Sequence, residues 1–168
     1  SQPGEPLKYA RHPLVYMVEA ADDICYEIMD IEDSHKLKIL SYKETEELLL
    51  AFFDEDIQRK IRQRIVDEGV SDENEKVVYM RASVIGKLEN ECVKAFLEHE
   101  EEILKATFNG GLTAHISDRQ HNAYKECEKV SYAKIYQSKP VLDIELSGYK
   151  IMATLMEVFI DAALNPTR

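Results

Sequence analysis

Residues 11–33 read RHPLVYMVEAADDICYEIMDIED, and apolar side chains recur along this stretch at the spacing of an α-helix. Apolar positions three and four residues apart place one side of a helix against a core. They are Leu14, Met17, Val18, Ala21, Ile24, Cys25 and Ile28. Pro13 suits the first turn of a helix, where its missing N–H is not needed. The stretch therefore predicts a helix over residues 13–33 with this apolar side buried.

A second face of the same helix is polar. Asp22, Tyr26 and Asp30 follow one another at intervals of four residues, so each lies about 40° round and about 6 Å along the axis from the previous one. Two carboxylates and a phenol in a row suit the wall of a polar ligand site, although the same pattern is common on a solvated helix face. Asp23 points about 100° away from Asp22, which predicts solvent exposure.

The rest of the chain also favours helices. No Asn-Gly or Asp-Gly hairpin separates alternating apolar runs. A capping box at Ser41 predicts a helix from there to residue 53, and a helix around residues 57–65 is expected to end before Gly69. Three more helices are expected over residues 73–108, 117–130 and 141–164. The last run is apolar almost all round, as in a central helix. We predict an all-α, single multi-helix domain of about six helices over residues 11–168, after a loose leader at 1–10.

Composition narrows the functional classes. The 168 residues are 45% hydrophobic and carry a net charge of −11, which argues against a general nucleic-acid surface. No apolar run approaches 18 residues, so no membrane span is expected. Cys25, Cys92 and Cys127 are scattered and predicted to be buried free thiols, in keeping with a cytoplasmic protein. Phosphate-binding and serine-nucleophile motifs are absent.

Two segments carry a family resemblance. ADDICYEIMDIED at 21–33 and IYQSKPVLDIELSGYKIM at 135–152 resemble, in the same order, segments of the HD-domain deoxyguanosinetriphosphate triphosphohydrolases, or dGTPases. The first matches a signature written AD-x-I-x-Y. The second matches the pattern F-x-HP-x-V-x-x-LE-L-x-GY, although Ser138-Lys139-Pro140 replaces the His-Pro and displaces the proline by one position.

The resemblance implies a function and a set of site residues. Members of this family cut a dNTP into a deoxynucleoside and tripolyphosphate. Asp22 is then expected to be a ligand of a divalent metal, Mn²⁺, Mg²⁺ or Fe²⁺, and Tyr26 and Asp30 to lie against the deoxyribose. Tyr136 and Glu145 correspond to residues of the nucleotide pocket. Because similar enzymes form hexamers or related oligomers, a homo-oligomer is expected as well.

One part of the family pattern is missing. The metal site of these enzymes needs a His and a His-Asp pair upstream of the Asp, and none of the five histidines here is followed by Asp. We therefore expect the chain to be the C-terminal portion of a longer enzyme, inactive alone and holding no metal tightly by itself. The alternative is a noncatalytic acidic helical module, regulatory or protein-binding, in which Asp22, Tyr26 and Asp30 are ordinary surface residues.

Overall fold

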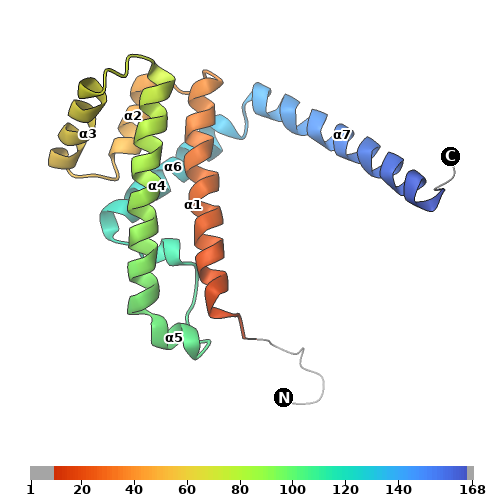
Figure 1. The fold of residues 1–168 in the computed structure, drawn as a ribbon, viewed down its shortest axis with the longest axis horizontal. Helices are drawn as coiled ribbons and strands as arrows, with labels where there is room; N and C mark the ends of the chain where they lie inside the picture. Colours follow the sequence, from red (N-terminus) through yellow and green to blue (C-terminus); the bar gives the residue numbers. More distant parts are fainter. Residues whose placement is uncertain (1–9, 166–168) are drawn as a thin grey trace.

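The computed structural model describes residues 10–165, which form seven α-helices joined by short connections (Figure 1). The helices are α1 (Pro13–Lys36), α2 (Tyr42–Leu50), α3 (Glu55–Asp67), α4 (Glu73–Glu98), α5 (Glu100–Leu104), α6 (Asp118–Val130) and α7 (Lys139–Leu164), with a 3₁₀ turn η1 (Leu112–Ala114) and a π-helical segment η2 (Ser131–Ile135). No strand occurs among the described residues, so the predicted all-α class is confirmed, with seven helices in place of about six. The leader predicted at 1–10 lies, apart from Ala10, outside the described residues.

The core lies between the two long helices α1 and α4, which run side by side (Figure 1). On α4 the buried residues are Val77, Met80, Val84, Leu88, Cys92 and Ala95, the stripe that the helical spacing predicts. Phe96, the residue after Ala95, is only partly buried. Helices α2 and α6 close the bundle, and the fully buried Leu49 and Phe52 fill its interior.

Helix α1 turns a different side toward this core than the one expected. Its buried hydrophobic residues are Tyr16, Ala20, Ile24, Ile28 and Ile31. Of the predicted buried side, Leu14 is 60% and Val18 is 68% exposed, and Cys25 is an exposed thiol, so the prediction is wrong for these residues. The physical reason is that α1 carries two apolar faces, and only one of them meets the bundle.

The ends of the helices follow local chemistry where the sequence signals it. Ser41 and Glu44 form the expected capping box at the start of α2. Gly69 follows the end of α3 with φ of +68°, a left-handed conformation that glycine adopts without strain. Ser117 stands before α6 as predicted, but its hydroxyl donates to Glu91 of α4 and does not cap its own helix.

Two predicted helices are too long. α2 ends at Leu50, before the expected residue 53, and Asp54 accepts a hydrogen bond from the Ile57 N–H to begin α3. The single helix predicted over 73–108 ends at Glu98, and the short α5 follows. At the break His99 leaves the helical conformation, with φ of −106° and ψ of 14°. Its ring packs 5.2 Å from that of Phe108, and this contact redirects the chain.

Helix α7 stands away from the bundle (Figure 1). Its polar side chains lie three or four residues apart on one narrow stripe, at Lys139, Asp143, Ser147, Lys150, Thr154, Glu157 and Asp161. The remaining circumference is apolar except at Glu145, yet no residue of α7 is buried. The apolar pattern of a central helix is therefore present, but the described residues do not cover it. Within residues 10–165 no helix is long and apolar enough to span a membrane.

Candidate functional site

The outward face of α1 carries the three polar residues singled out from the sequence. His12 caps the helix by accepting the Leu14 N–H at 3.2 Å. Further along, Asp22 is exposed, Tyr26 is 65% exposed and Asp30 is half-buried. The line therefore passes from open surface at Asp22 to the edge of the bundle at Asp30.

Asp30 is held by a residue from the other matched segment. The hydroxyl of Tyr136 donates a hydrogen bond of 2.9 Å to Asp30 Oδ2. Burial raises the pKa of the Asp30 carboxyl, and the hydrogen bond from Tyr136 opposes this rise. Burial also raises the pKa of the Tyr136 phenol, and the Asp30 carboxylate adds to that shift. Tyr136 thus remains a hydrogen-bond donor at neutral pH and fixes one oxygen of Asp30, while no described residue forms a hydrogen bond with the other oxygen.

The π-helical segment η2 positions Tyr136. Its first residue, Ser131, is buried and donates a hydrogen bond of 2.7 Å to Oε1 of Glu27, a buried carboxylate on α1. About two turns earlier along the chain, the Tyr124 hydroxyl donates to the Asp23 carbonyl at 3.0 Å. Single π turns inside α-helices re-aim side chains and are frequent at functional sites. Here Ser131, Tyr124 and Tyr136 together fix the α6–η2 connection against α1.

Glu27 and Ser131 were not selected from the sequence. The sequence does indicate Glu27, because it lies among Ile24, Ile28 and Ile31 on the buried face of α1. A carboxylate on that face must have a hydrogen-bond or charge partner. Burial raises the pKa of the Glu27 carboxyl, while the Ser131 hydrogen bond lowers it. The spacing along α1 therefore identifies Glu27, but it does not identify the serine 104 residues away.

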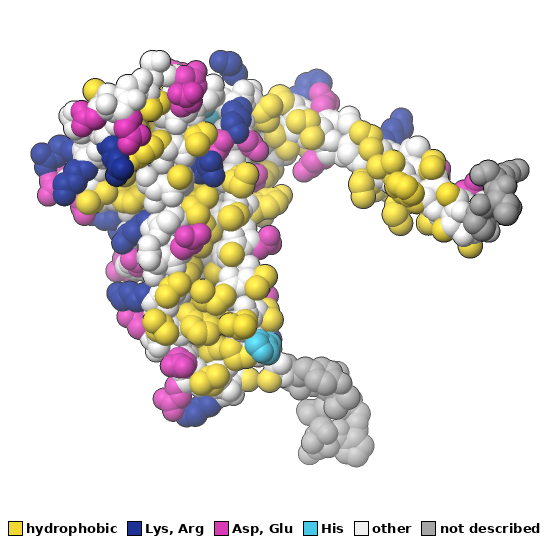
Figure 2. All heavy atoms as spheres, viewed as in Figure 1, with side chains coloured by type: hydrophobic (Ala, Val, Ile, Leu, Met, Phe, Trp, Pro, Cys, Tyr) yellow, Lys and Arg dark blue, Asp and Glu magenta, His cyan; other side chains and the backbone are white. Residues whose placement is uncertain are grey.

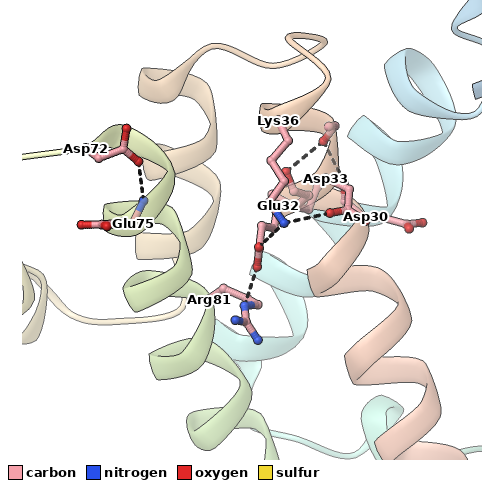
Figure 3. Close-up of polar contacts among 9 residues, drawn as sticks. Asp30, Glu32, Asp33, Lys36, Asp72, Glu75 and Arg81 are labelled. Atoms are coloured by element: carbon pink, nitrogen blue, oxygen red, sulfur yellow. Dashed lines mark hydrogen bonds and ion pairs between the residues drawn. The ribbon is translucent and has the colours of Figure 1, made fainter. Parts of the chain in front are cut away.

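A second buried carboxylate joins α1 to α4. The side chain of Glu32 is 7% exposed and lies between Arg81 of α4 and Lys36 of its own helix (Figure 3). Arg81 Nε lies 2.5 Å from Glu32 Oε2, an ion pair without hydrogen-bond geometry, and Lys36 Nζ lies 2.5 Å from Glu32 Oε1. Arg81 and Lys36 neutralise the charge of Glu32, so this cluster has a structural role. Asp22, by contrast, has no charged partner among the described residues.

The structure does not gather all five predicted residues. Asp30 and Tyr136 are in contact, and Asp22 and Tyr26 continue the line along α1. Glu145 lies on α7, exposed and opposite the polar stripe of that helix. Among residues 10–165 Glu145 has no hydrogen bond or ion pair, so nothing in the bundle connects it with the other four.

The donor set for a metal is incomplete within the described residues. They contain no group of three or more His, Cys, Asp or Glu side chains that could hold a metal ion. Asp22 itself fits the role of one ligand, since its carboxylate is exposed and no described residue pairs with it. Hard oxygen donors of this kind suit Mg²⁺ and Mn²⁺. The described residues thus form a helical bundle with a line of polar side chains, Asp22, Tyr26 and Asp30, along α1, and Asp22 is the candidate metal ligand among them.

Comparison with known proteins supplies the family. No family model matches the chain. A deoxyguanosinetriphosphate triphosphohydrolase-like protein of Pseudomonas aeruginosa is 33% identical over 159 residues, which cover 94% of this chain and 35% of that protein. A protein of the same description from Synechocystis is 30% identical over 94% of this chain and 33% of its own length. The deoxyguanosinetriphosphate triphosphohydrolase of Yersinia enterocolitica is 26% identical over 90% of this chain and 32% of its own length.

The chain belongs by homology to the dGTP triphosphohydrolase family. It spans about a third of the length of the curated relatives it matches.

Proposed function

We propose that this chain is the C-terminal part of a metal-dependent dNTP triphosphohydrolase that converts dGTP or another dNTP and water into a deoxynucleoside and tripolyphosphate. The observation that carries the proposal is the hydrogen bond between Asp30 and Tyr136. The family resemblance places these residues in one nucleotide pocket although they lie 106 positions apart, and the fold brings them into contact. The homology to named triphosphohydrolases supports the same function.

Each residue has a defined task in this proposal. Asp22 is one ligand of a divalent metal, which when bound would act as a Lewis acid on the α-phosphate and help to activate water. Tyr26 lies against the deoxyribose, and Asp30, oriented by Tyr136, accepts a hydrogen bond from the 3′-hydroxyl. Glu145 can belong to a nucleotide pocket only if a neighbouring subunit lies against α7, which is in line with the proposed homo-oligomer.

Charge explains why the chain alone is proposed to be inactive. Helix α1 bears seven carboxylates and one lysine, and five of the carboxylates are not buried, which makes a surface that repels a triphosphate. Cations and the remaining metal ligands must therefore come from the rest of the longer enzyme. Water attacks the α-phosphorus and its oxygen stays on the tripolyphosphate, while the bond to the 5′-oxygen breaks and the deoxynucleoside leaves with a proton on that oxygen. This step requires the negative charge of the triphosphate to be neutralised.

The test is tripolyphosphate release from dGTP with Mn²⁺. We expect activity in the full-length protein, a loss of more than about 100-fold in Asp22→Ala, and no activity in the isolated 168-residue chain. Asp33→Ala is the matched control, because Asp33 is an exposed carboxylate of the same helix that pairs only with Lys36. Undiminished activity in Asp22→Ala would remove the metal-ligand assignment.

Sugar recognition is tested separately. A dideoxynucleotide lacking the 3′-hydroxyl should be a poor substrate for the full-length protein, because one oxygen of the half-buried Asp30 carboxylate then has no donor. In Asp30→Ala this discrimination should disappear. Tyr136→Phe removes a hydrogen bond to a carboxylate, which contributes about 1.5–3 kcal/mol, so turnover should fall by about 10- to 100-fold.

The alternative remains a noncatalytic acidic helical module, regulatory or protein-binding. The observation that favours it is the uncovered apolar surface of α7, which is typical of a protein-interaction element. An inactive full-length protein, with Asp22→Ala and Tyr26→Phe indistinguishable from wild type in every assay, would support this second function.

A further inference from the structure

Two carboxylates of α1 are bound by Ser131, the first residue of the π-helical segment η2, and by Tyr136, which follows its last residue. Glu27 and Asp30 lie three positions apart, so their side chains are neighbours on adjacent turns of α1. Ser131 donates to Glu27 Oε1 at 2.7 Å, and Tyr136 donates to Asp30 Oδ2 at 2.9 Å. The Tyr136 N–H in turn donates to the Ser131 carbonyl at 3.0 Å. Ser131 therefore contacts Glu27 through its side chain and Tyr136 through its backbone, which closes a ring of contacts between α1 and η2.

The π-helical conformation of η2 allows both hydroxyls to face α1. In a regular α-helix, residues five positions apart point about 140° away from each other. In η2 the hydrogen bond from residue 136 back to residue 131 takes in one more residue per turn, which brings Ser131 and Tyr136 nearly one above the other. A regular continuation of α6 would turn one of the two hydroxyls away from α1. Because π turns are rare, a specific contact is needed to hold this one.

Glu27 supplies that contact from α1. Its side chain is buried, and Ser131 is its only hydrogen-bond donor among the described residues. Helix α1 has one lysine and no arginine, and Figure 2 shows hydrophobic side chains over much of the face of the bundle on which α1 lies. Lys125 of α6 pairs with Glu128 at 2.6 Å and not with Glu27. A buried carboxylate with a single donor depends strongly on it, so the Glu27 carboxylate holds Ser131, and with it the start of η2, against α1.

We propose that Glu27 and Ser131 are positioning residues of the sugar site, whose hydrogen bond keeps η2 in the conformation that brings the Tyr136 hydroxyl to Asp30 and so sets the preference for a substrate with a 3′-hydroxyl. This inference rests on the proposed function. Neither residue touches the substrate, because both act through Tyr136 and Asp30. A shift of the Tyr136 hydroxyl by about 1 Å takes its 2.9 Å contact beyond hydrogen-bonding distance, and a misplacement of this size can cost about 100-fold in rate.

The first test measures the preference for the 3′-hydroxyl in the full-length protein. It is expressed as the ratio of kcat/KM for tripolyphosphate release from dGTP to that from the dideoxy analogue. Ser131→Ala should lower this ratio by about 10-fold or more, because Asp30 loses its orienting donor. Tyr136→Phe should lower it at least as far, and the double variant no further, because Ser131 acts through Tyr136. An unchanged ratio in Ser131→Ala overturns the proposal, and so do effects that multiply in the double variant.

Arg81→Ala is the matched control for a general loss of stability. Arg81 of α4 pairs with Glu32, the other buried glutamate of α1, so its removal destabilises the packing of the same helix without removing a contact of η2. This variant should leave the ratio unchanged. An equal fall of the ratio in Arg81→Ala and Ser131→Ala would mean that Ser131 only stabilises the fold, and would refute the positioning role.

Two substitutions of Glu27 separate the hydrogen bond from the packing. Glutamine keeps a carbonyl oxygen that can accept from the Ser131 hydroxyl, whereas methionine has a similar volume and only a weakly accepting sulfur. Glu27→Gln should keep the ratio within about 3-fold of wild type, and Glu27→Met should lower it as far as Ser131→Ala does. Equal ratios in the two Glu27 variants contradict the proposal.

Fluorine NMR reports the position of Tyr136 independently of turnover. In the full-length protein labelled with 3-fluorotyrosine, the resonance that Tyr136→Phe removes belongs to Tyr136. This resonance should shift in Ser131→Ala and in Glu27→Met, and it should stay in place in Arg81→Ala. A Tyr136 resonance that stays in place in Ser131→Ala overturns the proposal.

The two readouts separate this inference from the function on which it rests. In a full-length protein that releases no tripolyphosphate, a Tyr136 resonance that shifts in Ser131→Ala supports the positioning of Tyr136 and refutes the enzymatic proposal. Full activity, with the preference for the 3′-hydroxyl unchanged in Ser131→Ala, refutes the positioning role alone.

Discussion

Replacing Ser131 by alanine should destabilise the bundle, and by more at neutral than at acidic pH. The Ser131 hydroxyl is the hydrogen-bond donor to Glu27 Oε1, at 2.7 Å, and Glu27 is only 7% exposed. Without the hydroxyl the carboxylate stays buried and loses this donor. Hydrogen bonds to charged groups contribute about 1.5–3 kcal/mol, so we expect a loss of about 2 kcal/mol at pH 7.

The pH dependence follows from the direction of the Glu27 shift. Burial raises the folded-state pKa of Glu27 above its ordinary value of 4.5, so the folded protein binds this proton more tightly than the unfolded chain. Above the raised folded pKa the carboxylate is ionised and its burial carries the full cost. As the pH falls through the raised folded pKa toward 4.5, the group is protonated and the cost disappears. The effect of Ser131→Ala should shrink over the same window.

Urea and thermal unfolding, followed by far-UV circular dichroism, would measure this difference. For a chain of this size about 2 kcal/mol corresponds to a fall of roughly 4–8 °C in Tm. Ser83→Ala is the control, because Ser83 donates only to the Tyr79 carbonyl within α4 and should change stability by less than about 0.5 kcal/mol at any pH. In a Glu27→Gln background the cost of Ser131→Ala should fall to about 1 kcal/mol. A cost independent of pH and of Glu27 would refute the reasoning.

Three further predictions follow from other contacts. Arg81→Ala leaves the buried Glu32 with Lys36 alone and should cost about 2–3 kcal/mol in urea unfolding, whereas Lys36→Ala, at an exposed lysine, should cost less than about 1 kcal/mol. Hydrogen bonds from Ser117 lower the pKa of Glu91 to about 2, so a carboxyl titration should show this group ionised at pH 3 and its stabilisation lost only as the pH falls from 4.5 toward 2. Deleting residues 139–168 should leave the unfolding temperature of the bundle nearly unchanged, because α7 has no buried residue, and should reduce self-association measured by analytical ultracentrifugation.

Features set by local chemistry could be predicted from the sequence. The capping box at Ser41, the glycine after α3 and the buried stripe of α4 depend on residues within a few positions of one another. The end of α4 could not be predicted in this way, because His99 leaves the helix to pack on Phe108 and His115. These rings meet only once the chain has folded back.

The candidate site likewise combines features that are local in the sequence with contacts between distant segments. The line of Asp22, Tyr26 and Asp30 follows from helical spacing on one element, whereas its partner Tyr136 comes from a segment 106 residues away and was expected only through the family resemblance. Glu27 and Ser131 show the limit most clearly. The burial of Glu27 can be derived from the period of α1, but the donor that makes this burial tolerable is set by the π-helical turn.

The error in the predicted buried side of α1 has a physical origin. A helix with apolar residues on two faces can satisfy only one of them within a small bundle, and the sequence does not state which face that is. In this chain α4 packs against the inner face of α1, from Tyr16 to Ile31, and buries it, whereas Leu14, Val18 and Cys25 on the other face stay exposed. The choice between the two faces is therefore made by the helices that pack against α1 and not by the spacing along α1 itself, which is why the predicted buried side was wrong at these positions.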